Sequence, residues 1–414
     1  MTKPRVGFIG LSHLGICSLL SVASKNFKVC GLDDDLNKIN LLKKRKTNIE
    51  EKNLDEYLKK YFQNITFTTN YNNLSNCNIV YLSQDINTDN FGNSNLIKVT
   101  KYINKAIKFL DKDALLVIMC QVPPGFTKKI KWPRNQLFYQ VETLIFGKAI
   151  ERAQYPERII VGTYEAKQKI NSLYKKYLNK FNCPILKMKF EEAELSKMFI
   201  NAYLVNDVIL TNLLSSITKK LNLDWSRSSN ALKLDKRIGK FSYLNPGLGI
   251  SGGNLERDIY NLSKISKNLK IDDTLFQIFI KQSQKRKKWL VDNINILKRL
   301  NIIKRYSKIG IIGITYKQNT NSVKNSPSIL IFNNLKNNKK LCYDKNLYNQ
   351  KLKFNNMQWC KIDKIYSAVD ILFIMHNDKI LNRIKLGKNV KAIFDPYSFI
   401  KSKNIRKEIR YFNL

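Results

Sequence analysis

Residues 6–15 read VGFIGLSHLG, a short apolar run followed at once by a turn with spaced glycines. The run Val6–Ile9 predicts a buried parallel strand, because such strands are covered on both faces and are apolar along their whole length. A helix is expected over Leu14–Ser24, and a second strand over Lys28–Leu32. Strand, turn, helix and strand together make a βαβ unit, the building block of a layered α/β fold.

The turn has the spacing of a dinucleotide-binding site, with one substitution. In the G-x-G-x-x-G pattern the first glycine makes the tight turn, the second admits the pyrophosphate and the third lets the helix pack on the strand. Gly10 and Gly15 hold the first and third positions, but Ser12 holds the second, where a side chain is expected to crowd the pyrophosphate. Asp33 ends the second strand, where its carboxylate is placed to bind the ribose hydroxyls of NAD and to repel the 2′-phosphate of NADP. The alternative interpretation is an ordinary strand–turn–helix followed by a polar turn.

Outward from this unit, the apolar runs divide the chain into three parts. Short runs separated by helical patterns continue to about residue 187, long helical patterns fill residues 188–303, and short runs return over 304–414. The sequence therefore predicts an N-terminal α/β domain, a helical middle and a C-terminal α/β domain with these boundaries. The further expected strands are Asn78–Leu82, Leu115–Met119, Arg158–Val161, Ile309–Ile314, a strand at Cys342, Ile371–Met375 and Ile393–Phe394, and the expected long helices are Glu191–Ile217 and Asp272–Leu300.

The chain of 414 residues is 43% hydrophobic, which is enough for two or three domains with real cores. Lys and Arg number 73 against 32 Asp and Glu, so the formal net charge is +41. The basic residues are spread along the whole chain, which indicates a compositional bias more than a nucleic-acid-binding stripe. Nucleic acid is therefore not expected as a partner, although the surface potential favours anionic and phosphorylated ligands.

Seven cysteines are scattered along the chain without a C-x-x-C pair, and the chain contains two histidines. This composition argues against a zinc site and against a disulfide framework, and it fits a reducing cytosol. The N-terminal residues show no signal-peptide core, and the apolar runs Ala114–Met119 and Ile371–Met375 are too short to span a bilayer. We therefore expect a soluble cytoplasmic protein without a metal and without membrane contact.

Further short motifs follow one another along almost the whole chain. They read CQVPPG at 120–125, ETLIFG at 142–147 with PERI at 156–159, AELSK at 193–197 with NA at 201–202, RIG at 237–239 with NPG at 245–247, GGNLERD at 252–258, and Lys317 followed by NT at 319–320 and SP at 326–327. In their order and spacing, and together with the turn at 10–15 and Asp33, these segments resemble the UDP-glucose/GDP-mannose dehydrogenase family.

The resemblance implies two Rossmann-like domains joined by a long central helical dimerisation region, an architecture like that of 6-phosphogluconate dehydrogenase. It also implies a homodimer that uses NAD and binds a nucleotide sugar between its domains. Members of the family oxidise a sugar CH₂OH twice to a carboxylate, through a thioester on a cysteine, and so make precursors of surface polysaccharide.

The thiol of that mechanism is missing. The family signature reads G-G-S-C-F/L-P-K-D, and in this chain Asn254 stands where the cysteine belongs. An amide cannot form the thioester, and nothing in the sequence places Cys120 or Cys183 as a substitute. The resemblance therefore implies a single two-electron oxidation of an alcohol.

The resemblance assigns roles to individual residues. Lys197 and Asn201 are four residues apart, so both face the same way on a helix, and a Lys–Asn pair at this spacing is similar to that of β-hydroxyacid dehydrogenases, where the lysine takes the alcohol proton. The implied catalytic residues are Lys197, Asn201, Asp258, Glu142 and Asn254; the implied cofactor-binding residues are Gly10, Gly15, Asp33, Lys38 and Gln121; and the implied substrate-binding residues are Leu144, Gly249, Lys317 and Lys324.

Three functional hypotheses follow. The first is a two-electron oxidoreductase that acts on a nucleotide-linked sugar. The second is a four-electron enzyme that passes through a hydrated aldehyde, with Asn254 orienting water. The third is a non-catalytic relative that binds a nucleotide sugar, and it is favoured by the departures from the family pattern at Ser12, Ile86, Gln121, Asn254 and Tyr397.

Overall fold

The computed structural model describes residues 3–86, 89, 93–347, 352–383, 385–400 and 405–414, and it contains two compact units, Met1–Ile200 and Asn201–Leu414. Each unit is built around one mainly parallel sheet. The prediction of an α/β fold with two Rossmann-like domains is confirmed. The boundaries at residues 187 and 303 stay a prediction.

The first unit holds an eight-stranded sheet in the order β3-β2-β1-β4-β5-β6-β7-β8. All neighbouring strands are parallel except β6 and β7, which are antiparallel. The chain reverses its direction of winding between β1 and β4, so the carboxyl ends of these two strands form the crevice where ligands bind in such sheets. The elements are β1 Val6–Ile9, α1 His13–Ser24, β2 Val29–Leu32, α2 Leu36–Lys43, α3 Leu54–Tyr61, β3 Ile65–Thr68, β4 Ile79–Leu82, α4 Ile97–Ala106, β5 Leu115–Ile118, β6 Leu137–Gln140, α5 Ala149–Gln154, β7 Ile159–Thr163, α6 Ser172–Leu178, β8 Ile185–Lys189 and the start of α7 Phe190–Lys220.

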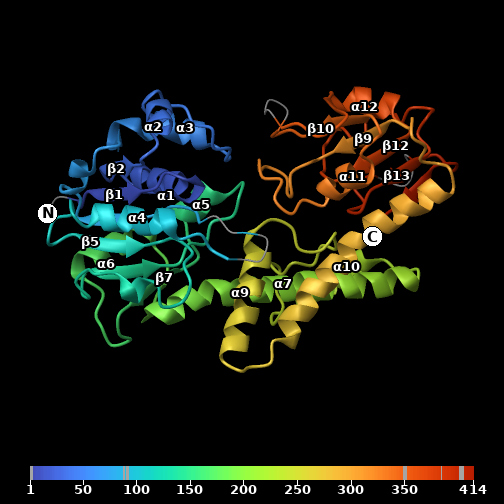
Figure 1. Ribbon diagram of the computed structural model, residues 1–414. Helices are drawn as coiled ribbons and strands as arrows, with labels where there is room; N and C mark the ends of the chain where they lie inside the picture. The colour runs from blue at the N-terminus through green and yellow to red at the C-terminus, as the bar shows by residue number, and fades with distance from the viewer. Residues whose placement is uncertain (1–2, 87–88, 90–92, 348–351, 384, 401–404) are drawn as a thin grey trace. The chain divides into compact units, whose positions relative to one another are not determined.

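Helices cover both faces of this sheet, which explains why its central strands are apolar throughout. Phe8 and Tyr81 point to the face covered by α1, α3, α5 and α6, while Ile9 and Leu82 point to the face covered by α4 and the first turn of α7. Figure 1 shows α1 beside β1 in this first layer. Alternate residues of one strand therefore serve two separate cores.

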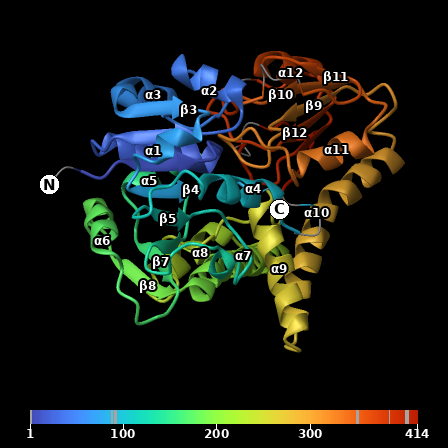
Figure 2. The ribbon, with the colours of Figure 1, turned by 60° about the vertical axis from the view of Figure 1, so that its left-hand side comes forward.

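The second unit holds a six-stranded, fully parallel sheet in the order β11-β10-β9-β12-β13-β14. Helices α10 and α11 pack on one face of the sheet and α12 on the other (Figure 2). The elements are α8 Trp225–Leu234, α9 Asn254–Asn268, α10 Thr274–Arg299, β9 Ile309–Ile312, α11 Ser328–Asn334, β10 Lys340–Tyr343, β11 Met357–Trp359, α12 Ile362–Ala368, β12 Ile371–Ile374, β13 Ala392–Phe394 and β14 Arg410–Phe412.

Helix α7 is the longest helix described, with 31 residues. Among the described residues it is the one helix that is long and apolar enough to cross a membrane by length and composition, and 33% of its most apolar stretch is buried. A core helix of a soluble protein meets the same criteria. Several large apolar side chains of α7 are exposed, among them Leu210, Leu213 and Ile217.

Candidate functional site

The turn after β1 requires glycine at its first and third positions. Gly10 has a φ of +85°, and a Cβ there would lie 2.7 Å from the Cβ of Gln84. A Cβ on Gly15 would lie 2.0 Å from the carbonyl oxygen of Gly10. The turn therefore brings the first residues of α1 against the end of β1, as in dinucleotide-binding turns.

Ser12, at the second position of the pattern, fastens the turn to the segment after β4. Its hydroxyl donates to the carbonyl of Ser83 at 3.1 Å and accepts from the backbone N–H of Asp85 at 2.9 Å. The carboxylate of Asp85 in turn accepts from the backbone N–H of Leu14 at 3.4 Å. The amide of Leu14 at the start of α1 thus already has an acidic side chain of the same chain as its partner.

Asp33 follows β2 and is fully buried. Its Oδ2 accepts from the N–H of Leu11 at 2.8 Å and from Nζ of Lys38 at 2.7 Å, and its Oδ1 accepts from the N–H of Asp35 at 3.0 Å and the hydroxyl of Tyr102 at 3.2 Å. Burial raises the pKa of Asp33, but the bonds from Lys38, Asp35 and Leu11 outweigh it and hold the pKa below its usual value. The structure therefore brings the cofactor candidates Asp33 and Lys38 together as an ion pair.

Lys197 and Glu142 form a second ion pair in the first unit. Nζ of Lys197, on α7, lies 2.9 Å from Oε1 of Glu142, and the two side chains are 11% and 14% exposed. Glu142 lies in the segment after β6, and its Oε2 accepts from the N–H of Leu144 at 2.9 Å. Three predicted residues therefore meet here, with the lysine held in place by an acid that also orders its own loop.

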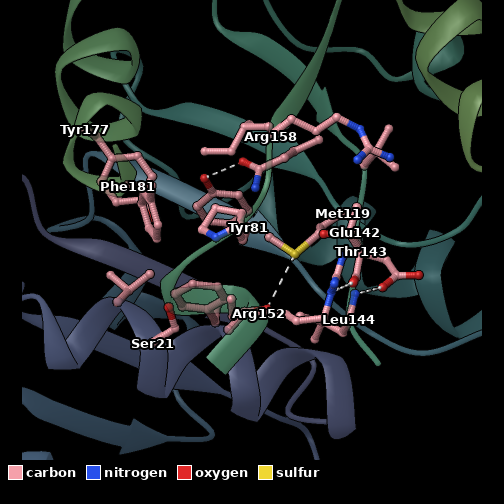
Figure 3. Close-up of a pocket in the computed structure, with 18 residues that line it drawn as sticks. Ser21, Tyr81, Met119, Glu142, Thr143, Leu144, Arg152, Arg158, Tyr177 and Phe181 are labelled. Atoms are coloured by element: carbon pink, nitrogen blue, oxygen red, sulfur yellow. Dashed lines mark hydrogen bonds between the residues drawn. The ribbon is translucent and has the colours of Figure 1, made fainter. Parts of the chain in front are cut away.

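A cavity of about 50 Å³ lies beneath this loop. Figure 3 shows the rings of Tyr81, Tyr177 and Phe181 on one side of the cavity and Glu142 and Thr143 on the other. Its volume is sufficient for a few water molecules and far too small for a nucleotide sugar.

The loop that carries Gln121 is anchored from α7. Glu194 is fully buried, and its carboxylate accepts from the N–H of Gly125 at 2.5 Å and from the N–H of Thr127 at 2.9 Å. Gln121 itself lies half-buried between β5 and this anchor. Glu194 thus fixes one of the loops at the carboxyl end of the first sheet.

In the second unit, Asn201 and Asp258 are hydrogen-bonded. Nδ2 of Asn201 donates to Oδ2 of Asp258 at 2.5 Å, and Nε of Arg257 lies 2.9 Å from the other carboxylate oxygen. All three side chains are buried. Asn254 is the exposed first residue of α9, one helical turn before Asp258.

Glycines of the segment 247–253 lie against four side chains of the same unit. Gly249 has a φ of +83°, and a Cβ there would lie 2.8 Å from Oγ of Ser283. A Cβ on Gly253 would lie 3.1 Å from Cδ of Lys324, so the stem of this lysine runs along the glycine. Lys317 is exposed on the loop after β9, and its carbonyl accepts from two threonine hydroxyls. The rings of Tyr397 and Tyr316 contact Gly247 and Gly252 in the same way.

The structure adds residues that sequence reasoning missed. Arg257 is a buried partner of Asp258, and its signal was a basic residue directly before the acid. Tyr102 reaches Asp33 from 69 positions further along the chain, and no sequence pattern marked that contact. The sequence also gave no reason to pair Lys197 with Glu142.

Cys120 and Cys17 are not activated thiols. Burial raises the pKa of Cys120 far above its usual range, and burial together with Glu51 and Asp85 does the same for Cys17. Both are therefore neutral thiols, which are poor nucleophiles. All seven cysteines are free.

A doubly wound sheet with a glycine turn after its first strand and an acid after its second defines a dinucleotide-binding protein of the Rossmann class. The chain belongs to the UDP-glucose/GDP-mannose dehydrogenase family: residues 4–178 match its NAD-binding domain, 191–284 its central domain and 310–407 its UDP-binding domain. NAD is therefore its cofactor, and the family supports an NAD-dependent nucleotide-sugar dehydrogenase.

Named relatives agree with this family. The chain is 31% identical to a UDP-glucose 6-dehydrogenase of Rickettsia conorii over 79% of its own length and 77% of the relative's. It is 28% identical to a UDP-glucose 6-dehydrogenase of Campylobacter jejuni over 92% of its own length and 96% of the relative's. Its fold is similar to the structure of a UDP-D-ManNAc dehydrogenase from Pyrococcus horikoshii, with a TM-score of 0.82 at 18% identity over 99% of this chain and 98% of that one.

Proposed function

We propose that the protein oxidises an alcohol of a UDP-linked sugar, with NAD as hydride acceptor, and stops after two electrons. The observation that carries the proposal is the set of ordered polar side chains on α7: Lys197 is paired with Glu142, and Asn201 is held by Asp258, while Asn254 stands in place of the thiol. The relatives named for UDP-glucose and UDP-D-ManNAc support a UDP-sugar as substrate.

The residues of the first unit fit NAD. Gly10 and Gly15 leave no space for a Cβ at the turn, and Asp33 lies at the end of β2 where a ribose is bound in this fold. Because the four lone-pair positions of Asp33 already accept hydrogen bonds, Lys38 or Tyr102 must give up its bond when the ribose binds.

The proposed chemistry balances without a thiol. NAD supplies the hydride acceptor when it is bound. Nζ of Lys197 takes the proton of the sugar hydroxyl, and Glu142 accepts a hydrogen bond from the lysine. Asn201 orients the hydroxyl, and Asp258, neutralised by Arg257, fixes the amide of Asn201. The alcohol loses two hydrogens. One leaves with both electrons as hydride, and the other leaves as a proton.

The stoichiometry of NADH tests the number of oxidation steps. We expect one NADH per limiting UDP-sugar, because the amide of Asn254 cannot trap the aldehyde as a thiohemiacetal, the adduct whose oxidation would give a thioester. Two NADH per sugar would contradict this proposal and favour the hydrated-aldehyde path. In that case Asn254→Ala should reduce the yield to one, since the variant lacks the amide that orients water. A panel of UDP-, GDP- and dTDP-sugars identifies the substrate class.

A non-catalytic nucleotide-sugar-binding protein is the second candidate, and the bonds of Ser12 favour it. They tie the turn to Ser83 and Asp85 across the place where pyrophosphate binds. If no sugar yields NADH and NAD does not bind, this candidate replaces the first. If no sugar yields NADH but NAD still binds, the substrate lies outside the panel.

Restoring the glycine should strengthen cofactor binding. We expect Ser12→Gly to raise NAD affinity, because the substitution removes the side chain at the second position of the turn. The expected increase is about 2–10-fold, which corresponds to the roughly 0.5–1.5 kcal/mol of one net hydrogen bond. Calorimetric titration with NAD measures the change. Ser21→Ala, on the same helix but away from the turn, is the matched control. An unchanged or weaker affinity of Ser12→Gly would show that the serine does not crowd the cofactor.

We further propose a cytoplasmic homodimer. Several large apolar side chains of α7 are exposed, and a second copy of the helix would cover them. NAD and nucleotide sugars are cytoplasmic metabolites, and seven free thiols suit a reducing compartment. A role in making precursors of surface polysaccharide follows from the family.

A further inference from the structure

Three metal-ligating side chains converge beside the dinucleotide turn. His13 and Cys17 are one turn apart on α1, and Glu51 lies in the segment between α2 and α3. Nε2 of His13 is 2.9 Å from Oε2 of Glu51 and 3.8 Å from Sγ of Cys17, and the three atoms lie within 4.8 Å of one another. Within the described part of the chain, no other group of three His, Cys, Asp or Glu side chains is this close.

The distances between these three ligand atoms match those around a small divalent ion. At bond lengths of about 2.0–2.3 Å, nitrogen, oxygen and sulfur ligands of a tetrahedral ion lie roughly 3–4 Å apart. Positions i and i+4 of a helix present two ligands on one face, as in helical zinc motifs. His13 and Cys17 satisfy this geometry with no change of backbone.

A hydrogen bond joins His13 to Glu51, and the thiol of Cys17 is a second, longer contact of the same ring nitrogen. Nε2 of His13 faces both the carboxylate of Glu51 and the thiol of Cys17. When this nitrogen carries a proton, it donates to Glu51 and cannot accept from the thiol; when it lacks the proton, it accepts from the thiol and opposes the carboxylate with a lone pair. A metal ion bonds all three atoms at once.

The three side chains are largely shielded from solvent, and one of them is held by backbone hydrogen bonds. The side chain of Glu51 is 1% exposed, that of His13 is 14% exposed and Cys17 is fully buried. The carboxylate of Glu51 also accepts from the N–H groups of Gly147 and Ala149 at 2.9 and 3.2 Å. Such bonds orient ligating carboxylates in metal sites.

The ring of His13 is held as well. The ring of Phe146 packs against it at 4.3 Å between centroids. This contact and the two amide bonds of Glu51 come from one segment, residues 146–149, which thus orders two of the three side chains.

We propose that His13, Cys17 and Glu51 bind one divalent transition-metal ion of the zinc class. Nitrogen, sulfur and oxygen ligands together favour such an ion over Mg²⁺ or Ca²⁺. Binding releases the thiol proton of Cys17 and any proton on Nε2, and water fills the fourth position. The ion would join the first turn of α1 to the segments at residues 51 and 146–149.

Cobalt is the probe for the test. Titrating the reduced, full-length protein with Co²⁺ should give one equivalent bound, visible d–d bands of a four-coordinate ion and a near-ultraviolet thiolate-to-cobalt band. Cys17→Ala should lose the thiolate band and bind Co²⁺ at least about 100-fold more weakly, beyond the 10–100-fold cost of losing an outer hydrogen bond. Cys183→Ala, which removes a half-buried thiol elsewhere in the first unit, should behave as the parent protein.

Two further measurements keep the test decisive if Cys17→Ala fails to fold. His13→Gln should weaken Co²⁺ binding to a similar degree, with circular dichroism confirming its fold. Zn²⁺ should displace the cobalt bands and raise the thermal midpoint of the parent protein but not that of His13→Gln. Absence of stoichiometric Co²⁺ binding by the parent protein, or an unchanged thiolate band in Cys17→Ala, would overturn the proposal.

Discussion

Lys197→Ala is expected to lower turnover by about 10²–10⁴-fold, the range that a positioned general acid–base group contributes. NAD affinity should stay nearly unchanged, because Lys197 lies on α7, whereas the glycine turn and Asp33 follow β1 and β2. The reason for the loss is specific: Lys197 is paired with Glu142, and its amine is the proposed acceptor of the alcohol proton. Steady-state NADH formation and NAD titration measure the two quantities.

A pH profile separates a chemical role of Lys197 from a structural one. If the lysine takes the proton, the pH limb of turnover that it controls disappears in Lys197→Ala and also in Lys197→Arg, whose side chain stays charged and cannot accept a proton. A structural role would instead lower turnover equally at every pH. Lys220→Ala, at the exposed end of the same helix, is the matched control and should leave turnover unchanged. Unchanged turnover in Lys197→Ala would remove the residue from the mechanism.

The strands that could be predicted are those buried on both faces. Val6–Ile9 and Ile371–Ile374 are fully apolar, and their predicted positions are confirmed. Strands β3, β8, β11 and β14, the edge strands of the two sheets, were not predicted, and β8 and β11 carry few buried residues. The interior strand β6 was not predicted either, although three of its four residues are buried. Sequence periodicity reports burial, so it misses strands at the edges of a sheet.

Within the candidate site, local spacing was informative and long-range pairing was not. The spacing of Lys197 and Asn201 on one helix followed from periodicity alone and is confirmed by α7. The resemblance already implied that Asn201 and Asp258 share a site. The hydrogen bond between these two residues and the pairing of Lys197 with Glu142 join segments far apart in sequence, and only the packed structure reveals these contacts. The cluster of His13, Cys17 and Glu51 escaped sequence reasoning for the same reason, since its third member lies 38 positions from its first.

Asp33→Ala is expected to weaken NAD binding by more than about tenfold, because the ribose hydroxyls lose their charged acceptor and charge-assisted hydrogen bonds contribute roughly 1.5–3 kcal/mol each. The substitution also leaves the N–H of Leu11 and the hydroxyl of Tyr102 without the partner that they have now, so some loss of stability is expected and Asp33→Asn serves as the milder variant. Discrimination against NADP should fall in both variants, since the carboxylate that repels its 2′-phosphate is absent.

Asp34→Ala is the matched control for this experiment. Asp34 is the next residue, but its carboxylate is partly exposed and pairs with Lys105 and the hydroxyl of Tyr71, so its loss should not alter NAD affinity. Calorimetric titrations of the three variants with NAD and NADP give the comparison. If NAD affinity is the same in Asp33→Ala as in the parent protein, the ribose is not bound at the end of β2. The bonds that Asp33 makes to Leu11, Lys38 and Tyr102 would then be purely structural, and the binding of NAD would have to rest on the turn at Gly10 and Gly15 alone.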